Sequence, residues 1–161
     1  MTKLTVILPI SSELPRTIEE TKKSILDQKG VDVDLIEIFD DNFARAVNTG
    51  VEQAKTELCC VIHDDVILPE DNILSSMIKT FITLNSRDTN IKILETCGII
   101  PNWEELSLVE KYLRAWENYG CEIGYVSYTD EKFFIFYKSF IEEIGGLNIE
   151  FYICCEDMDL G

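Results

Sequence analysis

The chain has 161 residues, of which 46% are apolar and 27% charged, a composition typical of one soluble globular domain and not of a disordered or fibrous protein. Its 30 acidic and 14 basic residues give a formal net charge of -16. A surface this negative repels phosphate backbones and anionic lipid headgroups, which argues against general binding of nucleic acids or membrane surfaces.

The first half of the chain alternates segments typical of buried strands with segments typical of amphipathic helices. In chain order, we predict strands at Leu4 to Leu8, Val33 to Phe39 and Leu58 to Ile62, each followed by a helix, at Thr17 to Asp27, Ala44 to Ala54 and Ile73 to Ile82. The first of these helices places Ile18, Ile25 and Leu26 on one face. This alternation predicts a parallel sheet with right-handed crossovers, flanked by helices.

The second half of the chain is less regular. In chain order, we predict a strand at Ile91 to Ile100, a helix within Trp103 to Tyr119, strands at Cys121 to Tyr128 and Lys132 to Tyr137, and a short helix at Phe140 to Ile144. Gly145–Gly146 is a natural left-handed end for that last helix. Repeats and linkers are absent from the sequence, so residues 1–161 are expected to form a single domain.

The cysteines and the N-terminus indicate the cellular compartment. None of the six cysteines forms a C-x-x-C pair of the zinc-binding kind, and we expect all six to be reduced thiols. No stretch approaches the roughly 20 apolar residues of a transmembrane segment. Met1 to Leu8 enters a strand directly and has no signal-peptide architecture. These features predict a cytoplasmic protein.

Paired acids follow two of the first three predicted strands: Asp40–Asp41 and Asp64–Asp65. The carboxyl ends of parallel strands face the same crevice, so the two pairs are expected within reach of one ligand. Each pair taken alone is more typical of a solvated turn. Two pairs at one edge of an acidic protein favour a site for magnesium or manganese, which bind carboxylates together with substrate phosphates and would also offset the charge of an anionic nucleotide.

Two further features allow alternative interpretations. His63, the only histidine, is either a turn residue at the edge of the metal site or a direct ligand. The acids of Glu156 to Asp159 either cap a helix N-terminus or include a rigidly held general base, and the two roles are compatible. Walker, G-x-G-x-x-G and G-x-S-x-G motifs are absent from the sequence, so a P-loop NTPase, a classical dinucleotide site and a serine hydrolase are not indicated.

The order and spacing of several motifs are similar to those of a known family. The motifs, each with the corresponding pattern of that family in parentheses, are Thr5 to Pro9 (T-V-I-I-P), Ser24 to Gln28 (S-I-L-x-Q), Phe39 to Asp41 (V-D-D), Ala44 to Ala54 (A-x-x-x-N-x-G-x-x-x-A), His63 to Asp65 followed by Leu68–Pro69 (D-x-D), Gly145 to Leu147 (G-G-F) and Glu156 to Asp159 (E-D-x-D). His63 replaces the first acid of the D-x-D pattern. Together they resemble the inverting glycosyltransferases of family 2, which have the GT-A nucleotide-sugar-binding fold.

The resemblance implies a role for each matching residue. The nucleotide sugar would be bound by Pro9, Asp40, Asp41, Arg45, Asn48 and Asp64. Within this set, Asp40 would form a hydrogen bond with the nucleobase. A DXD-like motif, Asp65 with Asp64, would hold Mn²⁺ or Mg²⁺, and Asp157 would be the base that deprotonates the acceptor hydroxyl. Gly145, Gly146 and Glu156 would lie on the acceptor side.

The same resemblance implies an architecture and a substrate class. It predicts a single α/β, GT-A-like domain with a mainly parallel central sheet. A Rossmann-like nucleotide-sugar-binding half would occupy about residues 1–100, and a smaller acceptor half about residues 101–161. The donor would be a UDP-sugar, or alternatively a GDP-sugar, and the acceptor a glycan, lipid or protein.

Two other classes of protein share features with this sequence. The first is a non-catalytic nucleotide-sugar-binding or assembly module on the same fold, because family members continue past the position of Gly161 with further elements. The second is a phosphoacceptor receiver domain, another parallel α/β domain with clustered aspartates. A receiver domain needs its acidic pair after the first strand, where Leu8–Pro9–Ile10 is apolar.

Overall fold

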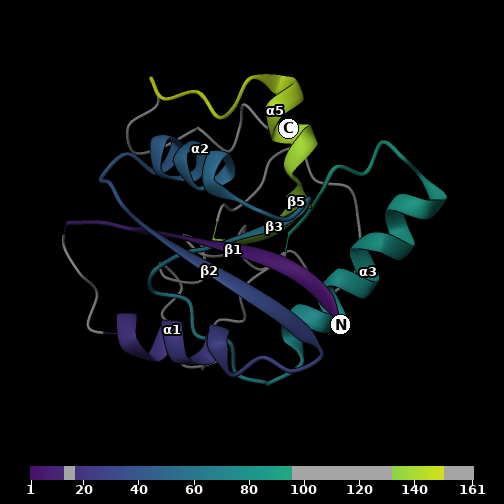
Figure 1. The fold of residues 1–161 in the computed structure, drawn as a ribbon, viewed down its shortest axis with the longest axis horizontal. Helices are drawn as coiled ribbons and strands as arrows, with labels where there is room; N and C mark the ends of the chain where they lie inside the picture. The colour runs from purple at the N-terminus through teal and green to yellow at the C-terminus, as the bar shows by residue number, and fades with distance from the viewer. Residues whose placement is uncertain (13–16, 96–131, 151–161) are drawn as a thin grey trace, which may run out of the picture.

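A computed structural model describes residues 1–12, 17–95 and 132–150 of the chain. Its elements in chain order (Figure 1) are β1 (Thr2–Ile10), α1 (Ile18–Leu26), β2 (Val31–Phe39), α2 (Phe43–Gln53), β3 (Leu58–Ile62), α3 (Ile73–Arg87), β4 (Ile93–Glu95), β5 (Phe133–Tyr137) and α5 (Lys138–Ile144). All six elements predicted for the first half are present. The elements predicted at Trp103 to Tyr119 and at Cys121 to Tyr128 lie outside the described residues, as does Glu156 to Asp159.

Within the described residues, the strands form one five-stranded sheet in the order β2-β1-β3-β5-β4. β1 is parallel to both β2 and β3, whereas β5 is antiparallel to both β3 and β4. The sheet is therefore mainly parallel, as predicted, but mixed, because β5 inserts in the reverse direction. This reversal places the amino end of β5 beside the carboxyl end of β3, where the peptide N–H of His63 donates to the carbonyl of Lys132 over 2.8 Å.

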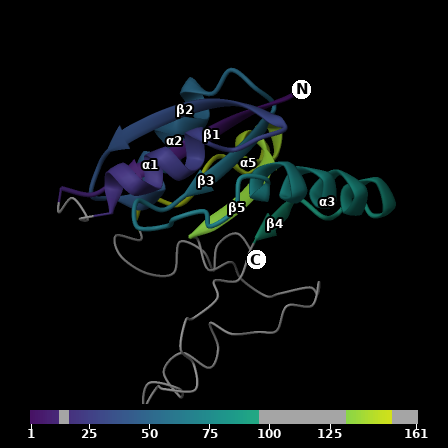
Figure 2. The same ribbon diagram turned by 90° about the horizontal axis from the view of Figure 1, so that it is seen from below.

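The helices cover the sheet in two layers, α1 and α3 on one face and α2 and α5 on the other (Figure 1). Figure 2 shows α1 toward the β2 side of the sheet and α3 toward β4. Alternate residues of each strand supply the two hydrophobic layers, so that Leu8 faces α1 and α3 while Ile7 faces α2. The predicted placement of Leu26 on the same face as Ile18 and Ile25 was wrong: those two residues pack in the core, whereas Leu26 is 59% exposed on the outer face of α1.

One glycine sets the distance between α2 and the sheet. A Cβ added to Gly50 would lie 2.4 Å from Cγ2 of Ile7, so only glycine permits this helix to approach β1 so closely. The carboxyl half of α2, the helix that carries Arg45 and Asn48, is thereby held close to the sheet.

The structure describes two of the six cysteines, Cys59 and Cys60. Cys59 and Cys60 are buried free thiols in β3, and burial raises the pKa of Cys59 to about 12, which makes it an inert core residue. Among the described helices, none combines the length and the apolar character that crossing a bilayer requires.

Candidate functional site

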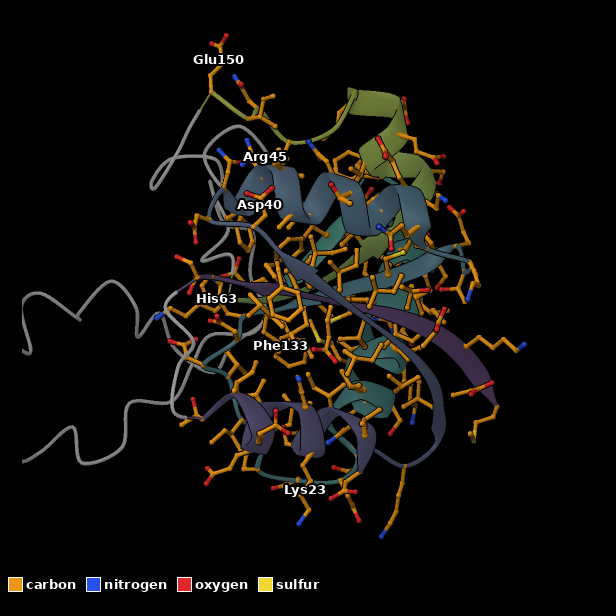
Figure 3. The ribbon with its side chains drawn as sticks, turned by 60° about the vertical axis from the view of Figure 1, so that its left-hand side comes forward. Lys23, Asp40, Arg45, His63, Phe133 and Glu150 are labelled. Atoms are coloured by element: carbon orange, nitrogen blue, oxygen red, sulfur yellow. The ribbon has the colours of Figure 1, made fainter. Side chains whose placement is uncertain are left out.

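The carboxyl ends of β1, β2 and β3 meet at one edge of the sheet, and Asp40, Arg45 and His63 lie toward this edge in Figure 3. β1 is the central strand of the three, so the residues after it lie between the two acidic pairs. Ser11 donates its backbone N–H to Oδ2 of Asp64 over 3.2 Å, and Ser12 donates its own to Oδ1 of Asp41 over 2.7 Å. The serine dipeptide thus joins the two acidic pairs into one site.

The turn after β3 is held at both ends by backbone hydrogen bonds. The N–H of His63 donates to Lys132, and its carbonyl accepts from the N–H of Val66 over 3.1 Å. The hydroxyl of Thr21, buried in α1, donates to the carbonyl of Asp64 over 3.1 Å. The backbone of the His63–Asp64–Asp65 turn is therefore fixed before any ligand binds.

The side chains of this turn form a compact group of possible metal ligands. Nδ1 of His63 lies 3.5 Å from Oδ1 of Asp64 and 3.5 Å from Oδ1 of Asp65. One ligand atom from each of the three residues lies within 4.8 Å of the others. The Asp64 side chain is only 10% exposed, whereas that of Asp65 is 56% exposed. Asp64 is thus a fixed member of the group, and Asp65 is open to an incoming ion.

The electrostatics of the turn favour charged carboxylates. The imidazole of His63 beside Asp65 is the largest cause that holds the pKa of that carboxyl below its ordinary value, against the opposing effect of partial burial. Asp65 is therefore ionised at neutral pH and available as a ligand. The imidazole itself stacks on the ring of Phe43, with centroids 5.4 Å apart and planes at 21°, which fixes its orientation.

One face of α1 supports the segment that follows the turn. Beyond Thr21, Oγ of Ser24 accepts from the N–H of Leu68 over 3.0 Å. Gln28 donates from Nε2 to the carbonyl of Glu70 over 2.6 Å and accepts at Oε1 from the N–H of Leu74 over 3.0 Å. The Ser24 to Gln28 motif thus has a structural explanation: it binds the chain between the acidic turn and α3.

The second acidic pair, after β2, is organised by the start of α2. Arg45 donates from Nε to Oδ2 of Asp40 over 2.5 Å and from Nη2 to Oδ1 over 2.6 Å, a two-pronged ion pair. The N–H of Asn42 also donates to Oδ1 of Asp40 over 2.9 Å. The Arg45 guanidinium holds the pKa of Asp40 below its ordinary value, and the Ser12 N–H does the same for the pKa of Asp41.

Two asparagines of the α2 region bind the segment after α5. Asn42 caps α2 with Oδ1 and donates from Nδ2 to the carbonyl of Ile149 over 3.1 Å. Asn48 donates to the carbonyl of Leu147 over 2.9 Å and accepts from its N–H over 2.8 Å. Gly146, at φ 89°, leaves no room for a Cβ, which would lie 2.9 Å from Oδ1 of Asn48. The chain leading toward Asp157 is therefore attached to the helix that carries Arg45.

The structure places most of the residues that the sequence singled out. Asp40 and Arg45 form one pair, and the Asn48 amide contacts the Leu147 backbone. Pro9 is buried in β1 opposite Ile38, beyond the three residues of β1 that pair with β3, where its missing N–H costs no hydrogen bond to β3. Asp157 and its neighbour Glu156 lie outside the described residues.

Sequence reasoning missed Ser11, Ser12 and Thr21. The available signal for the serines was their position directly after a strand that ends in Pro9–Ile10. Their importance depends on β1 being the central strand, which composition does not reveal. Thr21 carried no such signal, because a threonine within a helix is commonly structural.

A separate open groove lies between α1 and the segment 68–71. Its wall includes Glu20, Lys23, Asp27, Glu70 and Asp71, together with Ser24 and Gln28. None of the strand-end acids lines it, and its acidic side chains disfavour an anionic ligand. The candidate site is therefore the strand-end edge and not this groove.

The side chains of the His63–Asp64–Asp65 turn are suitable ligands for a divalent cation. Two carboxylates and an imidazole from three consecutive residues are suitable ligands, and their backbone is already held in place. Residues Asp64 and Asp65 supply the hard oxygen ligands that magnesium and manganese prefer.

Comparison with known proteins identifies the fold. No protein-family model and no curated protein sequence matches the chain. Among solved structures, it is similar to a mannosyltransferase from Pyrobaculum calidifontis in complex with GDP-Man and Mn²⁺, with a TM-score of 0.65 and 17% identity over 96% of this chain and 49% of that one. It is also similar to the catalytic domain of Drosophila β1,4-galactosyltransferase 7 in complex with xylobiose, with a TM-score of 0.61 and 14% identity over 99% of this chain and 59% of that one.

These similarities show that the chain has a GT-A-like glycosyltransferase fold, as the sequence motifs predicted. The chain spans about half the length of the mannosyltransferase.

Proposed function

We propose that this chain is a metal-dependent glycosyltransferase domain that uses a nucleotide-diphosphate sugar as donor. The observation that carries the proposal is the His63–Asp64–Asp65 group at the carboxyl end of β3, joined through Ser11 and Ser12 to the acids after β2. It lies in a fold similar to that of a mannosyltransferase whose structure contains GDP-Man and Mn²⁺.

In this proposal, the acids after β2 bind the nucleoside. Oδ1 of Asp40 accepts from two donors and Oδ2 from one, and each carboxylate oxygen has two lone pairs. One acceptor position on Oδ2 therefore remains for an N–H of the base. Arg45 holds the carboxylate in place for that contact. Both uracil and guanine offer such an N–H, so a UDP-sugar and a GDP-sugar are the two donors to compare.

The acids after β3 bind the diphosphate end through the cation. Asp64, buried and held by Ser11 and Thr21, is the positioned ligand, and the exposed Asp65 is the main one. When bound, the cation would neutralise the diphosphate leaving group as the glycosidic bond breaks. The cation would also offset the repulsion between an anionic nucleotide and a protein of net charge -16.

The acceptor side completes the proposal. Asp157 would take the proton of the acceptor hydroxyl, which then attacks the anomeric carbon directly with inversion, as in glycosyltransferases of family 2. Gly145, Gly146 and Glu156 would lie beside the acceptor. Asn42 and Asn48 would contribute by holding the chain at Leu147 to Ile149, eight residues before Asp157.

Calorimetry tests the binding part of the proposal. UDP, GDP and representative sugars of each are titrated into the protein with Mn²⁺, with Mg²⁺ and with a chelator. We expect binding of one nucleotide series in the presence of the metal and a large loss of affinity with the chelator. Absence of metal-dependent binding for every nucleotide would overturn the proposal.

Asp157→Asn tests the catalytic part. It should abolish sugar transfer and donor hydrolysis while leaving nucleotide affinity unchanged. If the wild-type chain binds the donor but neither transfers nor hydrolyses it with any acceptor class tried, the domain is a nucleotide-sugar-binding module.

A further inference from the structure

We infer that His63 is a direct ligand of the proposed cation, and that its imidazole makes the site select transition-metal ions over magnesium. This inference rests on the proposed function, since it concerns the same site. It assigns a role to the one member of the group that is not a carboxylate.

The distances within the turn suit a single ion. Nδ1 of His63 is 3.5 Å from an oxygen of each aspartate, and the three ligand atoms lie within 4.8 Å of one another. Ligands about 2.1 Å from an octahedral ion lie about 3 Å apart when adjacent and about 4.2 Å apart when opposite. The observed separations therefore need only small rotations of the side chains to close around an ion.

The imidazole is also positioned in advance. Its ring stacks on Phe43, and its backbone is held by Lys132 on one side and Val66 on the other. The side chain is 36% exposed, so the ring is accessible to an ion from solvent. A residue that merely filled a turn would need neither the stacking nor the approach of Nδ1 to both carboxylates.

The chemistry of the donor set then determines which ion binds. Magnesium prefers an all-oxygen shell, whereas imidazole nitrogen suits first-row transition metals. Replacing one carboxylate of a metal motif by a neutral imidazole also lowers the negative charge of the site, which weakens magnesium binding further. The ligand set of His63, Asp64 and Asp65 is thus biased toward manganese and the later transition metals.

An alternative role for the same contacts is an ion pair between protonated His63 and the aspartates. In that arrangement, the imidazole nitrogen carries a proton and cannot bind a metal. The two roles differ in whether a nitrogen coordinates the ion.

Pulsed electron paramagnetic resonance of bound Mn²⁺ decides between the two roles. Electron spin echo envelope modulation detects a nitrogen coordinated directly to manganese. His63 is the only histidine of the chain, so a modulation from coordinated imidazole in untagged protein can come from no other side chain. We expect that modulation in the wild-type protein with Mn²⁺ and the nucleotide diphosphate, and its loss in His63→Asn.

His63→Asp is the matched variant, because it restores an acid at the first position of the turn. It should still bind Mn²⁺ but without the nitrogen modulation. Competition titrations should show that its preference for Mn²⁺ over Mg²⁺ is about tenfold lower than in the wild type.

The outcomes separate the inference from the proposed function. If Mn²⁺ binds with the nucleotide but shows no nitrogen modulation, or if the metal preference is the same in His63→Asp, the inference is wrong and the metal site stands. If the wild type binds no metal with any nucleotide, the proposed function itself is wrong, and the inference with it.

Discussion

The backbone N–H of Ser11 donates a hydrogen bond to Oδ2 of Asp64 over 3.2 Å, and this contact ties the end of β1 to the acidic turn after β3. The next residue, Ser12, makes the equivalent contact to Asp41 after β2. Two consecutive N–H groups thus hold two carboxylates from different strands. The donors are backbone groups directly after β1, which lies between β2 and β3 in the sheet. The distance between the two acidic pairs is therefore set by the spacing of the strands.

Removing the charge of Asp65 should remove the metal site without unfolding the protein. Asp65 is more than half exposed, so Asp65→Asn leaves no buried charge unpaired. We expect Mn²⁺ affinity, measured by calorimetry in the presence of nucleotide, to fall about a hundredfold, roughly 2.7 kcal/mol. Asp32→Asn removes the same charge from an exposed position on β2 and serves as the control. Equal losses in both variants would mean that net charge alone governs binding.

The Thr21 hydroxyl should affect metal binding through the Asp64 backbone. Thr21→Val keeps the shape of a buried side chain but removes its hydrogen bond to the Asp64 carbonyl. We expect a loss of about 1 kcal/mol in the free energy of unfolding and a weaker affinity for Mn²⁺. Chemical denaturation and metal titration measure the two effects.

Thr80→Val is the control for Thr21, because it removes a hydroxyl-to-carbonyl hydrogen bond within α3, away from the acidic turn. It should leave Mn²⁺ affinity unchanged. If Thr21→Val also leaves it unchanged, then the geometry of the turn does not depend on α1.

Arg45 should determine how much Asp40 contributes to the loss of folding stability at low pH. The pKa of Asp40 is lowered in the folded protein, chiefly by Arg45, so this contribution to stability is present above the unfolded pKa and is lost as pH falls through the folded pKa. In Arg45→Met, the Asp40 carboxyl should titrate nearer its ordinary value of 3.8, and the associated loss of stability below about pH 4 should shrink. Carbon-detected NMR titration follows the carboxyl directly.

Arg87→Met, which removes an arginine from the last turn of α3, controls for the change in net charge. An unchanged Asp40 titration in Arg45→Met would show that the ion pair does not persist in solution.

Two neighbouring glycines should respond differently to the same substitution. Gly145 and Gly146 both have φ near +90°, so alanine is strained at either position, by about 1 kcal/mol. A Cβ at Gly145 meets nothing within 4 Å, whereas one at Gly146 would lie 2.9 Å from Oδ1 of Asn48. Gly146→Ala should therefore reduce the free energy of unfolding clearly more than Gly145→Ala, as measured by urea denaturation.

The double variant Gly146→Ala with Asn48→Ala tests the cause of that difference. Removing the amide relieves the steric conflict, so the double variant should lose less free energy of unfolding than the two single variants lose in sum. Simple additivity would indicate that the Asn48 amide does not contact this turn.

Much of the fold was predictable because its signals are local. Hydrophobic runs and helical spacing depend on residues within a few positions of one another, and they located every element from β1 to α3. The acids directly after the strand ends were also recognisable, since a parallel sheet brings its carboxyl ends to one edge. The roles of Asp157 and Glu156 stay predictions, because these residues lie outside the described part of the chain.

The amino-acid sequence by itself determined the alternation of strands and helices, the acidic pairs after two strands, and the glycine turn after α5. Only the tertiary structure decided the reversed β5, the serine dipeptide between the acidic pairs, and the attachment of Leu147 to Asn48. The reason is distance along the chain: Ser11 and Asp64 are 53 residues apart, and Asn48 and Leu147 are 99 apart. Contacts between such distant segments depend on strand order, which no local pattern of side chains encodes.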